Sequence, residues 1–206
     1  MIVLAMDASA LPALAGVVDE DGTVLEAIRI AEGQDTGSAL AAAVAVLLSR
    51  HGPPGRIAAV TGPGSFTGIR ASLALARGFA DAAGVPLQGV PLDVAFAPLR
   101  EASPERPLLI AVPARPGWLH FHDGGTWQTV PEREVPPVAG PVSAAGTAAG
   151  LLAANLAARG ADVRLLDARR PDLAAIAEGA RTALPAEPLY VDPPRARAAP
   201  LRPPPA

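Results

Sequence analysis

A run of small, turn-forming residues is the first candidate for chemistry in this sequence. Residues 62–70 read Gly-Pro-Gly-Ser-Phe-Thr-Gly-Ile-Arg and lie between the apolar run 57–60 and an Ala/Leu-rich segment that ends near residue 83. Glycine permits positive φ and close approach of other groups, so we expect a tight turn before a helix. Ser65 or Thr67 can cap that helix, and a helix N-terminus after a glycine turn can hold an anion. The candidate nucleotide-binding residues here are Gly62, Gly64, Ser65 and Thr67.

The same turn has a second interpretation. The sequence contains no lysine, because all 17 basic residues are Arg, and it has no Walker spacing. Phosphate-transfer sites use positively charged partners such as the Walker lysine, and this turn lacks them. The glycines would then serve to let the following apolar helix pack tightly against its own sheet and a neighbour.

Asp7 and Ser9 form a second candidate at the end of the expected first strand. Their oxygens could hold a hydrated Mg²⁺ ion next to a nucleotide. In actin-like ATPases a glycine-containing phosphate loop follows such an Asp, whereas here Pro12 stiffens the loop and no glycine comes early. This difference favours the alternative that Asp7 and Ser9 hydrogen-bond the turn after the strand.

The remaining reactive side chains give no catalytic or metal site. His120 and His122 are two apart on an expected strand and would share one side, but zinc needs three or four ligands. The only other histidine is His51, and cysteine is absent. We therefore expect two solvent-facing histidines beside Asp123, no catalytic residue, no metal and no cofactor.

Composition and charge limit the class of protein. Half of the 206 residues are hydrophobic but only 3% are aromatic, so Ala, Leu and Val must build the core. The net charge of −3 does not favour an autonomous nucleic-acid binder. No apolar run approaches the roughly 20 residues that span a bilayer, and the N-terminus is typical of a strand. We expect a cytoplasmic protein without a membrane segment.

The order of expected elements indicates a duplicated α/β fold. In the first half we expect strands at 2–6, 13–18, 23–30, 56–60 and 86–90, with helices at 38–50 and 68–83. In the second half we expect strands at 107–112, 118–122, 126–130 and 162–166, a helix from its cap Ser143 to about 158, and a helix at 171–183. This order predicts two ribonuclease-H-like/actin-like (ASKHA) subdomains, each β-β-β-α-β-α, the second truncated.

Proline-rich stretches suggest where these subdomains end. Prolines punctuate the segment 97–106, so we place the N-terminal subdomain at 1–98 and the smaller C-terminal one at 107–192. The Pro-rich tail 193–206 has few large apolar residues, and we expect it to be mobile. Its arginines, Arg195, Arg197 and Arg202, are expected to be solvated rather than bound to RNA.

The two helices of the first half are apolar on nearly their whole circumference. One side of each helix can pack on the sheet, and the rest would be an exposed apolar patch unless another chain covers it. The alternative is that the second subdomain covers it. The expected partner-interface residues are Leu40, Ala43, Val44, Leu47, Ile69, Leu73, Ala76 and Ala80.

Four segments resemble the TsaB (YeaZ) family. They are 62–70, the helix segment 76–80 (Ala-Arg-Gly-Phe-Ala), 90–92 (Val-Pro-Leu) and 188–191 (Pro-Leu-Tyr-Val). The resemblance implies a non-catalytic partner of TsaD, the subunit that transfers threonylcarbamoyl to adenosine 37 of tRNA. It also implies pairing with TsaD through the two N-terminal helices, a third subunit, the ATPase TsaE, and contact with tRNA only through the complex.

Differences from the family and two other functions remain open. Residues 34–38 lack the His-Ser or His-Thr pair of relatives, and 113–115 read Pro-Ala-Arg instead of Asp-Ala-Arg. One alternative is a free-standing ASKHA-type ATPase or small-molecule kinase. Another is a glycoprotease, which the missing metal ligands and nucleophile–base pair disfavour. Without TsaD, the apolar helices could also pair two copies of the chain as a homodimer.

Overall fold

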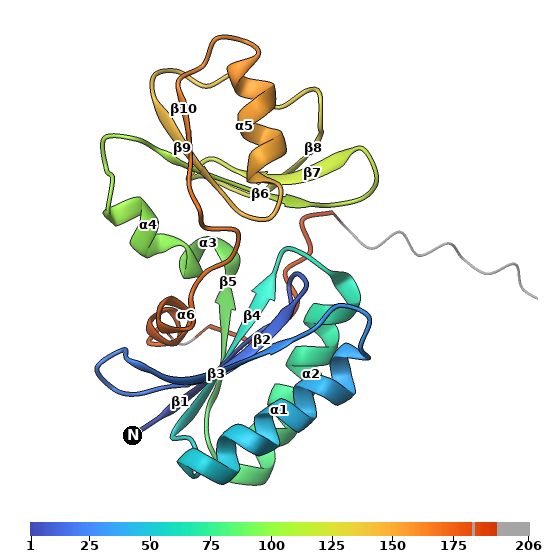
Figure 1. Cartoon of the computed structure of the whole chain (residues 1–206), viewed down its shortest axis with the longest axis vertical. Coiled ribbons are helices and arrows are strands. Elements are labelled where there is room, and N and C mark those ends of the chain that lie inside the picture. Colours follow the sequence, from blue (N-terminus) through green and yellow to red (C-terminus); the bar gives the residue numbers. More distant parts are fainter. Residues whose placement is uncertain (183, 193–206) are drawn as a thin grey trace, which may run out of the picture.

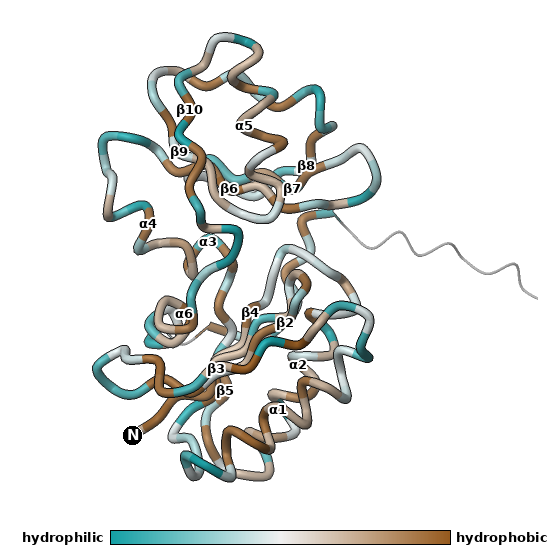
Figure 2. The backbone as a smooth tube through the Cα atoms, viewed as in Figure 1, coloured by the Kyte–Doolittle hydropathy of each residue, from teal (hydrophilic) through white to brown (hydrophobic). Residues whose placement is uncertain are grey.

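The computed structural model describes residues 1–182 and 184–192, which fold into two parts that face each other (Figure 1). Each part contains a mixed sheet of five strands within the described residues. Figure 2 shows hydrophobic segments along the central strands of both sheets, whereas many of the connecting loops are hydrophilic. The α/β class with two ASKHA-like subdomains is confirmed.

The first sheet has the strand order β3-β2-β1-β4-β5. Its strands are β1 (Val3–Asp7), β2 (Ala13–Val18), β3 (Val24–Ile30), β4 (Arg56–Gly62) and β5 (Leu87–Pro91). β1 lies in the centre, antiparallel to β2 and parallel to β4. All five residues of β1 are buried, because helices cover both faces of this sheet.

Two long helices cover one face of the first sheet. They are α1 (Thr36–His51) and α2 (Phe66–Ala83), which lie side by side (Figure 1). The Asp35 carboxylate caps α1 by accepting the Ser38 N–H at 2.9 Å. The Ser65 hydroxyl caps α2 by accepting the Gly68 N–H at 3.2 Å. The sequence left Ser65 and Thr67 open as caps, and the structure selects Ser65.

The second sheet repeats the topology of the first. Its strands are β6 (Leu108–Pro113), β7 (Trp118–His122), β8 (Gln128–Pro131), β9 (Val142–Ala145) and β10 (Val163–Leu165). The order β8-β7-β6-β9-β10 matches β3-β2-β1-β4-β5 strand for strand. The pairings agree as well, with β6 antiparallel to β7 and parallel to β9.

Ser143 does not cap a helix, which corrects the expectation from the sequence. It lies in β9, where its side chain is buried, and the helix α5 runs only from Ala149 to Ala157. The run Val-Ser-Ala-Ala has little strand propensity of its own. Parallel pairing with β6 on one side and β10 on the other makes it a strand.

The second half lacks a helix in the connection between its third and fourth strands. The first half has α1 there, whereas the second has the loop 132–141. Side chains of α5 and of the turn after it hold this loop: Asn155 donates to the Glu132 carbonyl at 2.9 Å, and Arg159 donates to the Val135 carbonyl at 2.8 Å. Two side-chain hydrogen bonds and the buried Val135 thus take the place of a helix.

Helix α6 (Leu173–Gly179) follows the second sheet in sequence but packs against the first. It contacts β1, β2 and β4 on the face opposite α1 and α2, and the Asp172 carboxylate caps it. We expected the helix at 171–183 to belong to the second half. The range 107–192 therefore includes a helix that covers the other sheet.

The junction of the two halves contains a shared hydrophobic cluster. The short helices α3 (Leu92–Ala95) and α4 (Ala97–Glu101) follow β5, and the buried Phe96 between them belongs to the same cluster as Leu108 and Ile110 of β6. The segment after α6 then returns to the first sheet, where the Leu189 N–H donates to the Thr61 carbonyl at 2.9 Å.

The described part of the chain contains no helix that is long and apolar enough to cross a membrane. Our expectations for the tail 193–206 and for Arg195, Arg197 and Arg202 lie outside the described residues.

Candidate functional site

The glycine-rich turn packs tightly on the loop that follows β1. The Ser65 N–H donates to the Ser9 carbonyl at 2.6 Å. A Cβ added to Gly64 would lie 2.2 Å from the Ser9 carbonyl oxygen, and one added to Gly68 would lie 2.1 Å from that of Ala8. Side chains do not tolerate such distances. These glycines are therefore required for packing within the protein, as the second interpretation of the turn predicts.

Asp7 and Ser9 make the hydrogen bonds that the alternative interpretation of this pair predicts. Asp7 is only 1% exposed, and its Oδ1 accepts both the Ser9 N–H at 2.8 Å and the Ser9 hydroxyl at 2.6 Å. The other oxygen, Oδ2, is buried without a hydrogen-bond partner among the described residues. The pair thus fixes the loop on which the glycine turn rests.

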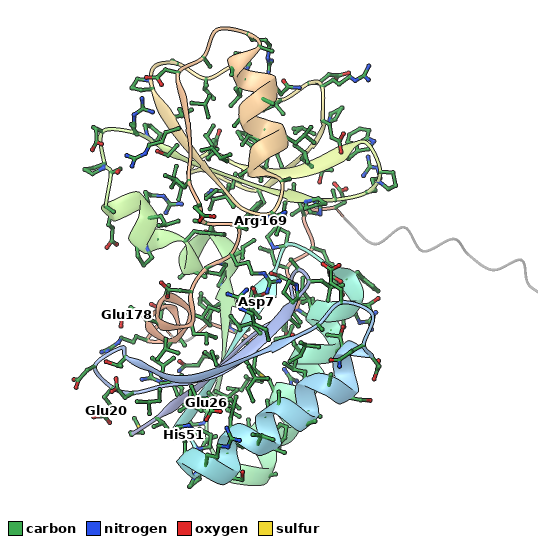
Figure 3. The ribbon with its side chains drawn as sticks, in the orientation of Figure 1. Asp7, Glu20, Glu26, His51, Arg169 and Glu178 are labelled. Carbon is green, nitrogen blue, oxygen red and sulfur yellow. The ribbon has the colours of Figure 1, made fainter. Side chains whose placement is uncertain are left out.

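A cavity of about 660 Å³ lies where the two halves face each other. Of the six predicted nucleotide-binding residues, Ser9, Gly64 and Ser65 line it, whereas Asp7, Gly62 and Thr67 do not. Figure 3 shows Asp7 and Arg169 close to this junction. The structure therefore brings three predicted residues together at one wall and leaves three away from it.

The opposite wall contains residues that our sequence reasoning did not assign to a site. They are Arg115, His120, Thr147 and Arg169, whereas Tyr190, which was also not assigned, lies beside Phe66 on the first wall. Arg115 forms an ion pair with Asp192 at 3.1 Å, and its guanidinium lies 3.8 Å from the centre of the Trp118 ring. Segment 188–191 had been noted for its likeness to TsaB relatives, whereas 113–115 had been noted only as a difference from them, so the signal was available for Tyr190 alone.

His120 is neutral at the cavity wall near pH 7. Burial lowers its pKa below the ordinary value, with a further lowering by Arg115 and an opposing effect of Asp192. Its Nδ1 lies 3.0 Å from the Thr129 hydroxyl. In the described part of the chain no histidine is hydrogen-bonded to a serine, so His120 and Ser9 do not form a nucleophile–base pair.

The eight residues predicted at a partner interface face the protein's own sheet. Leu40, Ala43, Val44, Leu47, Ile69, Leu73, Ala76 and Ala80 are all buried, and they form one cluster with β1, β2 and β4. This corrects the interface assignment. An apolar helix side packs first against the core of its own domain, and the periodicity did not show which of the two apolar sides that was.

The outward side of the helix pair is nevertheless built from small residues. Ala42, Ala45 and Val46 are exposed on α1, and Ala74 and Gly78 are exposed on α2. Charged residues on the exposed parts of these helices include Arg50, Arg70, Arg77 and Asp81. We call the five small residues the outer helix face.

Comparisons with known proteins agree on the fold. A Pseudomonas aeruginosa protein described as similar to the peptidase YeaZ superposes with a TM-score of 0.73 at 20% identity, covering 93% of this chain and 99% of that one. YeaZ from Pseudomonas aeruginosa gives a TM-score of 0.69 at 22% identity, covering 92% and 99%. Residues 48–133 match the family model of TsaD, tRNA N6-adenosine threonylcarbamoyltransferase. This chain has the YeaZ fold.

The likeness has two different extents. The YeaZ fold spans more than nine tenths of the chain, whereas the TsaD family match covers less than half, from the end of α1 to just beyond β8. That segment includes the glycine turn, α2 and the β6–β7 hairpin. No curated protein matches the sequence significantly.

The two histidines of β7 do not face solvent, which corrects our expectation. They share one side of the strand, but that side faces the junction, and His122 is buried. His122 Nδ1 accepts the Gly124 N–H at 3.1 Å, and its Nε2 lies 3.9 Å from Asp93. Among residues 1–182 and 184–192 no group of three potential ligands could hold a metal ion.

Proposed function

We propose that this chain is a non-catalytic partner of a TsaD-like subunit. Together with a TsaE-like ATPase it would be required for threonylcarbamoylation of adenosine 37 in tRNAs, which places it in the cytoplasm. The YeaZ fold and the TsaD family segment support this proposal. It also follows the resemblance of the sequence to TsaB, and tRNA would be contacted only through the complex.

The observation that carries the proposal is the outer helix face. Ala42, Ala45 and Val46 are exposed on α1, Ala74 and Gly78 are exposed on α2, the two helices pack side by side, and their buried sides already cover the sheet. Small side chains allow the backbones of two helix pairs to approach closely. A stable specific contact buries on the order of 1,600 Å² in total, and two helices of 16 and 18 residues offer a surface of that kind.

The non-catalytic role is supported by what the reactive side chains already do. Asp7 and Ser9 hydrogen-bond each other, Gly64 and Gly68 accommodate backbone carbonyls, and His120 lies beside Thr129. None of these arrangements supplies an activated nucleophile. The alternative remains a free-standing ASKHA-type ATPase or small-molecule kinase. ATP turnover by the isolated chain that disappears in Asp7→Ala would replace our proposal with this alternative.

The docking test uses the outer helix face rather than the buried residues. Ala45→Glu on α1 and Ala74→Glu on α2 would each place a carboxylate in the proposed contact. An unpaired charge there costs several kcal/mol, and each 1.4 kcal/mol weakens association about tenfold, so we expect roughly a hundredfold loss of TsaD affinity. Binding would be measured by isothermal titration calorimetry with the TsaD-like protein, and tRNA modification by a reconstituted assay.

Ala154→Glu is the matched control, because Ala154 is exposed on α5 in the other half. It should leave TsaD binding and modification unchanged. If Ala45→Glu and Ala74→Glu proteins melt normally and still bind TsaD, the docking surface is wrong. We further expect the isolated chain to form a homodimer through the same face, and Ala74→Glu to make it monomeric by light scattering.

A further inference from the structure

Two exposed aromatic rings and an arginine lie together at the start of α2. Phe66 is 53% exposed and Tyr190 is 43% exposed, and their ring centroids are 5.8 Å apart. The Arg70 guanidinium lies over the Phe66 ring, 5.0 Å from its centre. The whole sequence has only two Trp, one Tyr and four Phe, so two neighbouring rings in solvent mark a contact surface. We call Phe66, Arg70 and Tyr190 the aromatic stack.

The aromatic stack is continuous with the outer helix face along α2. Every fourth residue from Phe66 is exposed, namely Arg70, Ala74 and Gly78. Residues four apart are neighbours on one side of a helix, and the stripe from Phe66 to Gly78 is about 18 Å long. Ala74 and Gly78 are the α2 part of the outer helix face. A partner that lies along α2 on these small residues therefore also reaches the aromatic stack.

This stripe has an excess of positive charge. Arg70 and Arg77 are exposed on the same side of α2, with Asp81 as their acidic neighbour. Within the described residues Arg70 forms no hydrogen bond or ion pair, and a guanidinium stacked on a ring still has N–H groups to donate at its edge. The first turn of α2 contains no acidic residue, so nothing there offsets the positive end of the helix dipole. The charges favour an acidic partner over a second copy, in which the same arginines would face each other.

We propose that the aromatic stack is the anchor of the docking surface and receives an acidic segment of the TsaD-like subunit. A carboxylate of that segment accepts hydrogen bonds from Arg70, and a neighbouring apolar side chain packs on Phe66 and Tyr190. Aromatic residues and arginine supply most of the binding energy at protein interfaces, whereas small residues mainly allow close approach. The inference rests on the proposed function and goes beyond it, because it assigns the affinity and the choice of an acidic partner to three named side chains.

The test titrates the full chain and its variants with the TsaD-like protein by calorimetry, at about 50 and 500 mM salt. Phe66→Ala should weaken binding roughly tenfold or more at both salt concentrations, and Tyr190→Ala should weaken it less. Arg70→Gln should weaken binding at low salt and reduce its salt dependence, because screening already removes much of an exposed charge contact at high salt. The matched controls lie in the second half. Leu165→Ala removes an apolar side chain that is 55% exposed, Arg133→Gln removes an exposed charge, and both should bind as the unmodified chain does.

The outcomes separate this inference from the docking proposal. Thermal melting first checks that Phe66→Ala folds, and Arg70→Gln keeps both rings, so it tests the charge even if Phe66→Ala does not fold. If Ala45→Glu abolishes TsaD binding while Phe66→Ala and Arg70→Gln bind normally, the anchor is wrong and the docking proposal stands. If the unmodified chain does not bind the TsaD-like protein, both are wrong. If Phe66→Ala dissociates a homodimer but leaves TsaD binding unchanged, the stack receives a second copy and the inference is overturned.

Discussion

The two sheets of this protein share a strand order but differ in what covers them. The first sheet has α1 and α2 on one face and α6 on the other, whereas the second has α5 and the loop 132–141 on the face away from the junction. The outer helix face of the first half is therefore exposed. The second half instead presents its other face, with His120 and His122, to the junction.

This difference shows how one duplicated topology can serve two purposes. The strand order is set by backbone pairing, which the two halves have in common. The helices decide which surfaces remain exposed. The first sheet is also covered by α6, which follows the second sheet in the sequence. Docking is thus expected at the first half.

The largest loss of stability is expected from a substitution on the buried side of α1, the helix that the second half lacks. Leu47 is 0% exposed between α1 and the first sheet. Leu47→Asp buries an unpaired carboxylate, so we expect a loss of several kcal/mol, enough to unfold the first half, by circular dichroism and thermal melting. Ala45→Asp, two residues away on the exposed side of α1, should fold normally. A stable Leu47→Asp protein would contradict the assignment of this helix side to the core.

The second prediction compares two glycines of α2. Gly68→Ala would push a methyl group to 2.1 Å from the Ala8 carbonyl oxygen, and we expect a loss of about 1–3 kcal/mol in the free energy of unfolding. Gly78 meets nothing within 4 Å, so Gly78→Ala should instead stabilise the helix by about 0.5–1 kcal/mol. Urea denaturation of both variants measures the contrast. If both substitutions changed the free energy of unfolding in the same direction, the structural role that we assign to the glycine turn would be wrong.

A third prediction concerns the loop that replaces a helix in the second half. Asn155→Ala removes the donor to the Glu132 carbonyl, and we expect a loss of about 1 kcal/mol. Hydrogen exchange should show faster opening of residues 132–141 while α1 keeps its protection. Unchanged exchange in this loop would mean that the Arg159 hydrogen bond and the buried Val135 side chain are enough to hold it in place.

The smallest expected effect is a pH dependence of stability that differs between the two halves. Burial lowers the pKa of His122 below its ordinary 6.5, opposed by Asp93 and Asp123 and reinforced by Arg100. The unfolded chain then takes up a proton that the folded chain does not, so stability falls as the pH drops below about 6.5. His122→Asn keeps an acceptor for Gly124 and should flatten this slope in melts between pH 7.5 and 5.5.

Carboxylates of the first half respond at lower pH. Hydrogen bonds from Ser38 lower the pKa of Asp35, and one from His51 lowers that of Glu26, which lies beside it in Figure 3. Their contributions are present above the ordinary values and are lost as the pH falls through the lowered ones. If the stability of His122→Asn still falls with pH above pH 5, we would assign this pH dependence to His120, whose pKa is also lowered.

The sequence by itself determined most elements of the first half and their order. Apolar runs and the glycine-rich turn at 62–70 predicted β1 to β5, α1 and α2 to within about two residues. Local signals suffice where an element begins with a cap such as Ser65 and ends at a glycine. The same turn gave the resemblance to TsaB.

Only the tertiary structure decided β9, the side of each helix that is buried, and the second wall of the cavity. Val142–Ala145 is a strand because two neighbours pair with it, and no local propensity indicates this. Leu47 and Ala45 are both apolar, and only contact with the sheet distinguishes the buried one. Arg169 and Tyr190 line the same cavity as Phe66, although more than a hundred residues separate them from Phe66 in the sequence. Only the folding of both halves brings these residues together.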